Sequence, residues 1–195
     1  MRLVPLTPDY PLVAFDCGDE DLNKFLLDDA KPSQVIGLAA SLVEELRIAN
    51  TFILEADDGR VAAYFCLLSD KVSKDEVIGS RWKKVRSRFP VGKQFRSYPS
   101  VKIGRLAVSL DFRGLHVGKT MMKMLVRKLQ AERNALAFRF ITVDAYLSAV
   151  PFYEKGGTCD VDNIVGGYHG FLHLTKKDED EHTRLMYFDM MEIAD

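Results

Sequence analysis

A strand that runs into a glycine-bearing turn and then a helix is the part of this sequence best suited to binding chemistry. It is the stretch VKIGRLAVSLDFRGLHVGKTMMKML, residues 101–125. The first amides of a helix lack intrahelical partners and carry about half a positive charge, so such a turn favours anions. Gly114 and Gly118 let the backbone approach a phosphate closely, and Arg113 and Lys119 add positive charge. The stretch therefore predicts a phosphate site.

The end of this turn, Gly118-Lys119-Thr120, has the G-K-[ST] ending of an ATP-binding P-loop. A P-loop needs a glycine five residues before Gly118, but Arg113 stands there and Gly114 comes one residue too late. A P-loop also usually follows the first strand of its domain, whereas this turn follows a hairpin and a long insertion. These departures favour a phosphate ligand other than ATP.

Size and composition favour a single cytoplasmic domain over residues 1–195. The 195 residues and 47% apolar content supply an ample core. No apolar run is long enough to span a membrane, and the first residues lack the features of a signal peptide. We therefore expect no membrane contact. The three cysteines form no CxxC pair, so we also expect reduced, buried thiols and no metal.

The order of the predicted elements indicates an α/β (α+β) fold. We expect a mixed, mostly antiparallel central sheet of six to seven strands, flanked by helices. Asp19 can cap a helix, and Gly59 suits the turn of a hairpin. The predicted elements are a strand at 3–6, helices at about 19–30 and after Pro32, a hairpin at 51–68, a basic insertion at about 73–100 with a short helix near 81–89, a strand at 101–108, a helix at 117–133, a strand at 138–146, a short helix at 148–157 and a strand at 183–193.

The phosphate turn resembles the acetyl-CoA-binding motif of the GNAT N-acetyltransferase superfamily. In that family a strand with "LAV" leads into an [RQ]-x-x-G-x-[GA] pyrophosphate loop and then a helix. Arg113, Gly114 and Gly118 fit this pattern, while His116 occupies the usual middle-glycine position. The substitution matters only if residue 116 takes a positive φ, where histidine is tolerated but uncommon.

Three further segments are similar to this family. AYLSAVPFYEKGG resembles its A-x-x-FYEK-x-GF segment, with Thr158 in place of the usual phenylalanine. FDCGDEDLNKFLLDDA and TRLMYFDM resemble the opening and the last strand of one branch. That branch includes toxin-type enzymes that acetylate aminoacyl-tRNA. The resemblance covers nearly the whole chain except the basic insertion.

The resemblance implies a residue-by-residue site for acetyl-CoA. The "LAV" residues, Leu106, Ala107 and Val108, would offer backbone groups to the pantetheine arm and the acetyl carbonyl. Tyr153 would meet the departing thiolate, since a phenol near pKa 10 stays protonated at neutral pH. The pyrophosphate would lie on the amides of Arg113, Gly114, His116, Val117, Gly118, Lys119 and Thr120. The implied reaction is direct attack of a primary amine on acetyl-CoA in a ternary complex. The general base stays open between Asp144, Asp111 and a water relayed from a backbone carbonyl.

The acceptor depends on the interpretation of the basic insertion. Between Val77 and Leu110 there is no acidic residue, and aromatic residues interleave with the cations, a pattern that suits RNA. The nine cations are Arg81, Lys83, Lys84, Arg86, Arg88, Lys93, Arg96, Lys102 and Arg105. The alternatives are a small-molecule or peptide amine, with the insertion a solvated loop or a homodimer contact, and tRNA bound through residues 81–105. A CoA-binding sensor or interaction module without catalysis is the alternative outside the enzymes.

Overall fold

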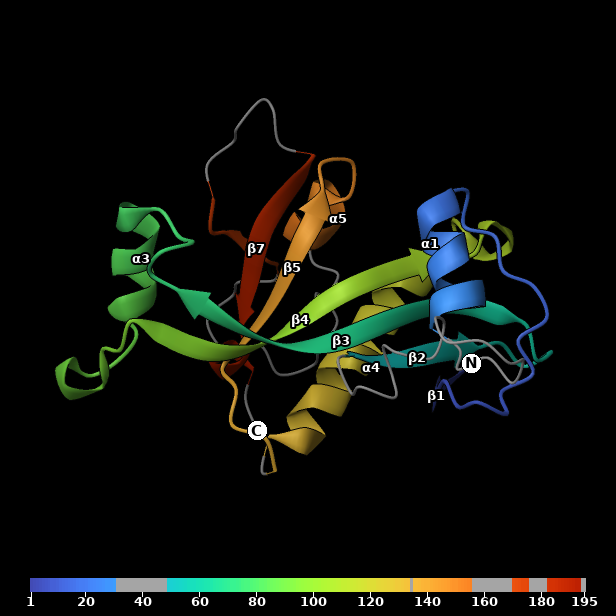
Figure 1. Cartoon of the computed structure of the whole chain (residues 1–195), viewed down its shortest axis with the longest axis horizontal. Coiled ribbons are helices and arrows are strands. Elements are labelled where there is room, and N and C mark those ends of the chain that lie inside the picture. The colour runs from blue at the N-terminus through green and yellow to red at the C-terminus, as the bar shows by residue number, and fades with distance from the viewer. Residues whose placement is uncertain (31–48, 134, 156–169, 176–181, 194–195) are drawn as a thin grey trace. The chain divides into compact units, whose positions relative to one another are not determined.

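The computed structural model describes residues 1–30, 49–133, 135–155, 170–175 and 182–193 (Figure 1). The helical pattern predicted after Pro32 lies outside the described residues, as do Gly157, Thr158 and the acidic run near residue 180. Within the described part, no helix combines the length and apolar content needed to cross a bilayer.

The predicted fold class is confirmed, because helices flank a seven-stranded, mostly antiparallel sheet with the strand order β1-β2-β3-β4-β5-β7-β6. The strands are β1 (Arg2–Pro5), β2 (Ala49–Glu55), β3 (Val61–Ser73), β4 (Ser97–Val108), β5 (Phe140–Tyr146), β6 (Leu172–His173) and β7 (Thr183–Asp189). The α-helices described are α1 (Glu20–Lys24), α3 (Gly79–Arg86), α4 (Val117–Glu132) and α5 (Val150–Glu154). Shorter turns of helix cover Phe25–Asp29, Val91–Lys93, Leu110–Phe112 and Met190–Glu192.

The chain divides into two compact units. The first comprises Met1–Leu68 and Ile103–Met124, and the second comprises Ser69–Lys102 and Leu125–Asp195. Strands β3 and β4 and helix α4 each contribute residues to both units.

The first unit forms around the β2–β3 hairpin and the short helix α1. Gly59 takes φ 82° in the hairpin turn, a conformation that costs glycine little. Asp19 caps α1 by accepting a hydrogen bond from the Leu22 amide at 3.1 Å, as predicted. Tyr64 is fully buried; its hydroxyl donates to the Leu22 carbonyl at 2.7 Å and its ring meets Phe15 edge-on. These contacts hold α1 against the sheet of this unit.

The second unit forms where β5 pairs with β7 and α3 covers part of their surface. Thr142 lies opposite Tyr187 in the β5–β7 ladder. Trp82 and Val85, three residues apart on α3, are both buried in a cluster that includes Phe140 and Tyr187. Helix α5 lies beside β5 (Figure 1). This cluster therefore combines aromatic with aliphatic side chains.

The main departures from the predicted elements lie at strand ends. Strand β4 begins at Ser97 and β3 continues to Ser73, so the insertion outside the sheet is shorter than predicted. The last strand ends at Asp189, whose side chain caps the following 3-10 turn through the Met191 amide at 3.1 Å. The two-residue strand β6 was not predicted, because so short a segment has no recognisable alternation.

Candidate functional site

The predicted phosphate turn adopts an unusual backbone. After the 3-10 turn Leu110–Phe112, Gly114 takes φ 79° and His116 takes φ 57°. His116 is the only residue other than glycine with a positive φ among the described residues. Helix α4 then begins at Val117, and the Thr120 amide donates to the His116 carbonyl at 3.1 Å. The question that the sequence raised about His116 is thus answered: this position needs the left-handed region.

A backbone with two left-handed residues directly before a helix is typical of anion-binding turns. Alternation of left-handed with other conformations turns successive N–H groups toward one side and creates a concavity that suits an anion. The first turn of α4 adds amides that have no partner within the helix. His116 and Lys119 are exposed at this point, so the turn is open to solvent.

Arg113 does not direct its guanidinium into this concavity. Its Nη2 donates to the Cys17 carbonyl, which ties the turn to the segment before α1. A second tie is the hydrogen bond from the Leu110 amide to the Asp16 carbonyl, at 2.8 Å. Gly18 takes φ 75° beside them, and an added Cβ there would lie 3.4 Å from Leu110. The side chain of Arg113 therefore supports the turn and leaves ligand contact to the backbone.

Sequence reasoning did not identify residues 16–18 as a support for the turn. Asp16 accepts hydrogen bonds from the Gly18 amide at 2.8 Å and from Asn23 at 2.9 Å, which lower the pKa of its carboxyl. The Cys17 amide donates to Asn23 at 2.8 Å. The available signal is the FDCG stretch, whose resemblance to the family's opening segment does not reveal this contact.

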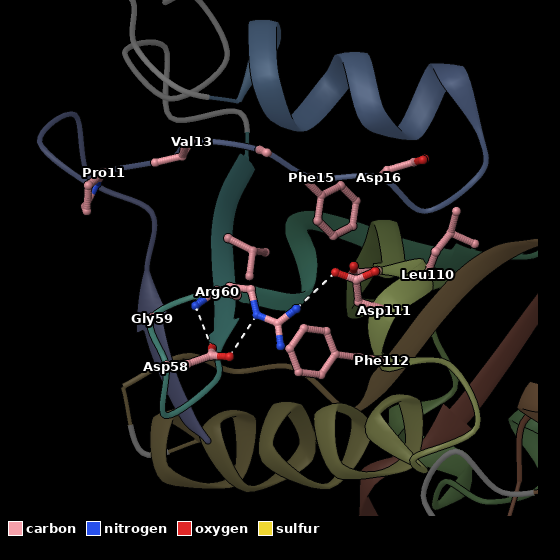
Figure 2. Close-up of a pocket in the computed structure, with 13 residues that line it drawn as sticks. Pro11, Val13, Phe15, Asp16, Asp58, Gly59, Arg60, Leu110, Asp111 and Phe112 are labelled. Atoms are coloured by element: carbon pink, nitrogen blue, oxygen red, sulfur yellow. Dashed lines mark hydrogen bonds and ion pairs between the residues drawn. The ribbon is translucent and has the colours of Figure 1, made fainter.

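Arg60 braces the turn from the hairpin (Figure 2). Its guanidinium pairs with Asp58 at 2.8 Å and with Asp111 at 3.0 Å, and lies 4.8 Å from the centre of the Phe112 ring. The Arg60 amide and guanidinium lower the pKa of the Asp58 carboxyl. Because all three charged side chains are more than half exposed, the ion pairs add little stability and mainly fix orientation.

A cavity of about 480 Å³ opens beside this brace (Figure 2). Among the described residues, its lining includes Phe15 and Phe112, the three carboxylates of Asp16, Asp58 and Asp111, and the one cation of Arg60. Carboxylates repel a pyrophosphate, so this cavity is a poor match for the phosphates of a nucleotide.

The "LAV" residues lie at the end of β4. Ala107 is buried in the first unit's core with Ile53 and Tyr64, while Leu106 and Val108 are half-buried. This alternation follows the two-residue period of a strand. The Ser109 amide, one residue further, donates to the Ala62 carbonyl at 2.9 Å and anchors the strand end to β3.

Tyr153 lies in the second unit, on α5. It is 4% exposed, and burial raises the pKa of its hydroxyl above the ordinary value of 10.0. Its ring packs edge-on against Phe152 at 5.1 Å and Phe171 at 5.3 Å between centroids. Because this packing leaves little freedom, Tyr153 is a rigidly held phenol that stays protonated at neutral pH.

Gly170 fixes the backbone beside Tyr153. The Phe171 amide donates to the Tyr153 carbonyl at 2.9 Å. A Cβ at Gly170 would lie 2.1 Å from the Glu154 carbonyl oxygen, so only glycine fits there without a backbone shift. The close approach of two backbones was not visible in the sequence.

Both carboxylates considered as general bases form ion pairs. Asp144 lies 2.5 Å from Lys102, and Asp111 is held by Arg60. Among the described residues, no group of three or more His, Cys, Asp or Glu side chains is arranged to hold a metal ion.

The basic insertion is more neutralised and more buried than its composition indicates. Trp82 and Tyr98 are 3% and 2% exposed, so neither ring can stack on a base, whereas Phe95 is 58% exposed. Several cations between Arg81 and Arg105 pair with carboxylates outside the acid-free stretch 77–110: Arg88 with Asp189 and Glu192, Arg96 with Asp75, Lys102 with Asp144 and Arg105 with Asp21.

Comparisons with known proteins show which domain family and which solved structures this chain resembles. Residues 90–165 match the family model of the acetyltransferase (GNAT) domain. A KacT mutant has a similar fold, with a TM-score of 0.69, 20% identity and coverage of 97% of this chain and 95% of that one. AtaT complexed with acetyl-methionyl-tRNAfMet has a TM-score of 0.68 and 22% identity, with coverage of 97% of this chain and 95% of that one. A structure described as a bacterial toxin has a TM-score of 0.70 and 15% identity, with coverage of 97% of this chain and 90% of that one.

No curated protein matches this chain. The solved structures share its fold across nearly the whole chain, and the family match covers the phosphate turn and Tyr153. The predicted resemblance is therefore supported at two levels: residues 90–165 match the acetyltransferase (GNAT) domain in sequence, and the chain shares the fold of the solved structures compared with it. The similarity in fold extends to a structure described as a bacterial toxin, in line with the resemblance of two segments to the toxin-type branch.

Proposed function

We propose that this chain transfers the acetyl group of acetyl-CoA to a primary amine by direct attack in a ternary complex. The observation that carries this proposal is the left-handed backbone at Gly114 and His116 immediately before α4. A chain accepts a histidine in this conformation only when the surrounding structure gains from it, and anion-binding turns are a common case.

The pyrophosphate of acetyl-CoA is the anion that we assign to this turn. The proposed contacts are the backbone amides of the turn and the first turn of α4, with Leu106, Ala107 and Val108 receiving the pantetheine arm. The turn residues are Arg113, Gly114, His116, Val117, Gly118, Lys119 and Thr120. Two structures of similar fold, AtaTR bound with AcCoA and a mutant AtaT bound to the C-terminus of the antitoxin AtaR and acetyl-CoA, support this choice of co-substrate.

Tyr153 is the proposed acid for the departing thiolate. Attack of the neutral amine nitrogen on the acetyl carbonyl forms the C–N bond, and the nitrogen then loses one proton to the general base, for which Asp144, Asp111 and a relayed water are the candidates. Collapse of the intermediate breaks the C–S bond. The thiolate leaves with the electron pair, and the Tyr153 hydroxyl stabilises it by donating a hydrogen bond or a proton. Because burial raises the pKa of this phenol, the hydroxyl is protonated at neutral pH and can donate to the sulfur as the negative charge develops there.

A second candidate acceptor is the aminoacyl amine of charged tRNA. It is favoured by the exposed lysines of the insertion, Lys83, Lys84 and Lys93, with the exposed ring of Phe95. The similar AtaT structure is a complex with acetyl-methionyl-tRNAfMet. The small-molecule or peptide amine remains the first candidate because three of the insertion's four aromatic rings pack into the protein.

The test is release of free thiol from acetyl-CoA with panels of amines and with charged tRNA. Tyr153→Phe should lower kcat by about 100-fold or more and leave the Kd for CoA unchanged. Tyr146→Phe is the matched control, because Tyr146 is 43% exposed on β5 and should behave as wild type. Tight CoA binding without thiol release for any acceptor would contradict the proposed catalysis and favour a CoA-binding module.

A further inference from the structure

A second, smaller cavity lies wholly within the second unit, where α3 meets β6 and β7. Its volume is about 260 Å³, below the usual range for a drug-sized ligand, so it suits a single chemical group. We call it the α3 pocket. It is lined by Arg81, Lys84, Leu172, His173 and Tyr187.

The α3 pocket collects cations that the rest of the described protein leaves without counter-ions. Arg81 and Lys84 are three residues apart and share one face of α3. Neither forms an ion pair within the described residues, in contrast to Arg88, which pairs with Asp189 and Glu192 at 2.7 Å. An unneutralised pair of cations at one cavity favours an anionic occupant.

The pocket holds Arg81 in place before any ligand arrives. Arg81 Nη1 donates to the His173 carbonyl, which leaves the other donors of the guanidinium for a second partner. The ring of His173 lies outside this contact, with Nε2 at 2.6 Å from the Glu154 carboxylate. No carboxylate is among the described residues that line the pocket. A pre-oriented guanidinium next to an ammonium suits the several oxygens of a phosphate.

The walls strengthen this preference. Tyr187 is 2% exposed and Leu172 is half-buried, so one side of the pocket is low in polarity. Charge attraction is stronger beside such a wall than in bulk water. Lys84 itself is exposed, so a phosphate attached to a larger molecule can reach it from solvent.

We propose that the α3 pocket binds one phosphate group of an RNA acceptor, with Arg81 and Lys84 as its cationic contacts. The inference deepens the RNA form of the proposed function and rests on it for the identity of the molecule that carries the phosphate. The phosphate chemistry itself could also come from a free phosphate or a nucleotide, and the experiment separates these sources.

The experiment compares Lys84→Gln with Lys83→Gln in the full-length protein. Lys83 is an exposed neighbour on α3 outside the pocket, so the two variants remove the same charge from the same helix. Binding of a fluorescent single-stranded RNA is followed by anisotropy between 50 and 200 mM salt. Each phosphate contact contributes about 0.7 to the slope of log K against log salt for single strands. Lys84→Gln should lower that slope by about 0.7, and Lys83→Gln should leave it nearly unchanged.

Inorganic phosphate and AMP, added as ligands in thermal-shift measurements, supply the second arm. The pocket would be assigned to a free phosphate, and the RNA assignment overturned, by one combination of results. In it, the ligand-induced rise in Tm is lost in Lys84→Gln and kept in Lys83→Gln, while the salt slope of RNA binding is the same in both variants. Equal effects of the two variants in both arms would overturn the proposal. Thiol release with a small amine is measured in parallel, so loss of acetyl transfer, a failure of the proposed function, is distinguishable from loss of phosphate binding.

Discussion

The left-handed conformation of His116 makes a specific prediction about stability. A residue other than glycine pays about 1–2 kcal/mol to occupy this region. Glycine avoids that cost but loses roughly 0.5–1 kcal/mol more through its freedom in the unfolded chain. The His116 side chain is exposed, so few contacts are lost on substitution. His116→Gly should therefore raise the free energy of unfolding by about 0.5–1 kcal/mol.

A β-branched residue at the same position should have the opposite effect. Valine is a clear outlier at a positive φ, so His116→Val should cost about 1 kcal/mol or more relative to wild type. For a chain of this size, 1 kcal/mol corresponds to about 2–4 °C in Tm. We expect a slightly raised Tm for glycine and a fall of about 2–4 °C or more for valine.

The affinity for acetyl-CoA tests whether the positive φ of His116 matters for binding. If the backbone presents the pyrophosphate amides, His116→Ala should bind acetyl-CoA nearly as wild type, while His116→Val should weaken binding by about tenfold, the equivalent of about 1.4 kcal/mol. Calorimetry measures both affinities, and Leu115→Val is the control, because Leu115 is 65% exposed and its φ is not positive. Equal weakening by alanine and valine would refute the backbone explanation and assign the contact to the imidazole.

Two further predictions concern the second unit. Burial raises the pKa of the Asp189 carboxyl, but hydrogen bonds from Arg139 and Arg88 outweigh it and the pKa is lowered. Its contribution to stability is therefore present above the unfolded pKa near 4 and is lost as pH falls through the folded pKa. Asp189→Asn should cost about 3 kcal/mol at pH 7 and less at pH 3 in urea titrations, and an equal cost at both pH values would contradict this. Gly170→Ala forces apart its contact with the Glu154 carbonyl, so kcat should fall while the Kd for acetyl-CoA stays constant; an unchanged kcat would show that the α5 backbone tolerates the shift.

The local elements of this protein could be predicted from the sequence because their signals are local. A capping side chain at Asp19, a turn glycine at Gly59 and the hairpin around it depend on a few neighbouring residues, and all three appear in the structure as expected. The phosphate turn was recognisable for the same reason, since a strand, a glycine and a helix start follow one another in the chain. The role of each turn residue remains a prediction.

The partners of the charged and aromatic side chains were decided by tertiary structure. The sequence shows a run of cations from Arg81 to Arg105, but not that Arg88 pairs with Asp189 or that Trp82 is buried. It likewise shows Arg113 beside glycine, but not that its guanidinium supports the Cys17 carbonyl. Charge and burial depend on residues far apart in the chain, and their pairing is set by the sheet register and by packing. For that reason composition indicates an evenly basic insertion. It is the fold that pairs Arg88 with carboxylates and places Arg81 and Lys84, which have no counter-ion among the described residues, at one pocket.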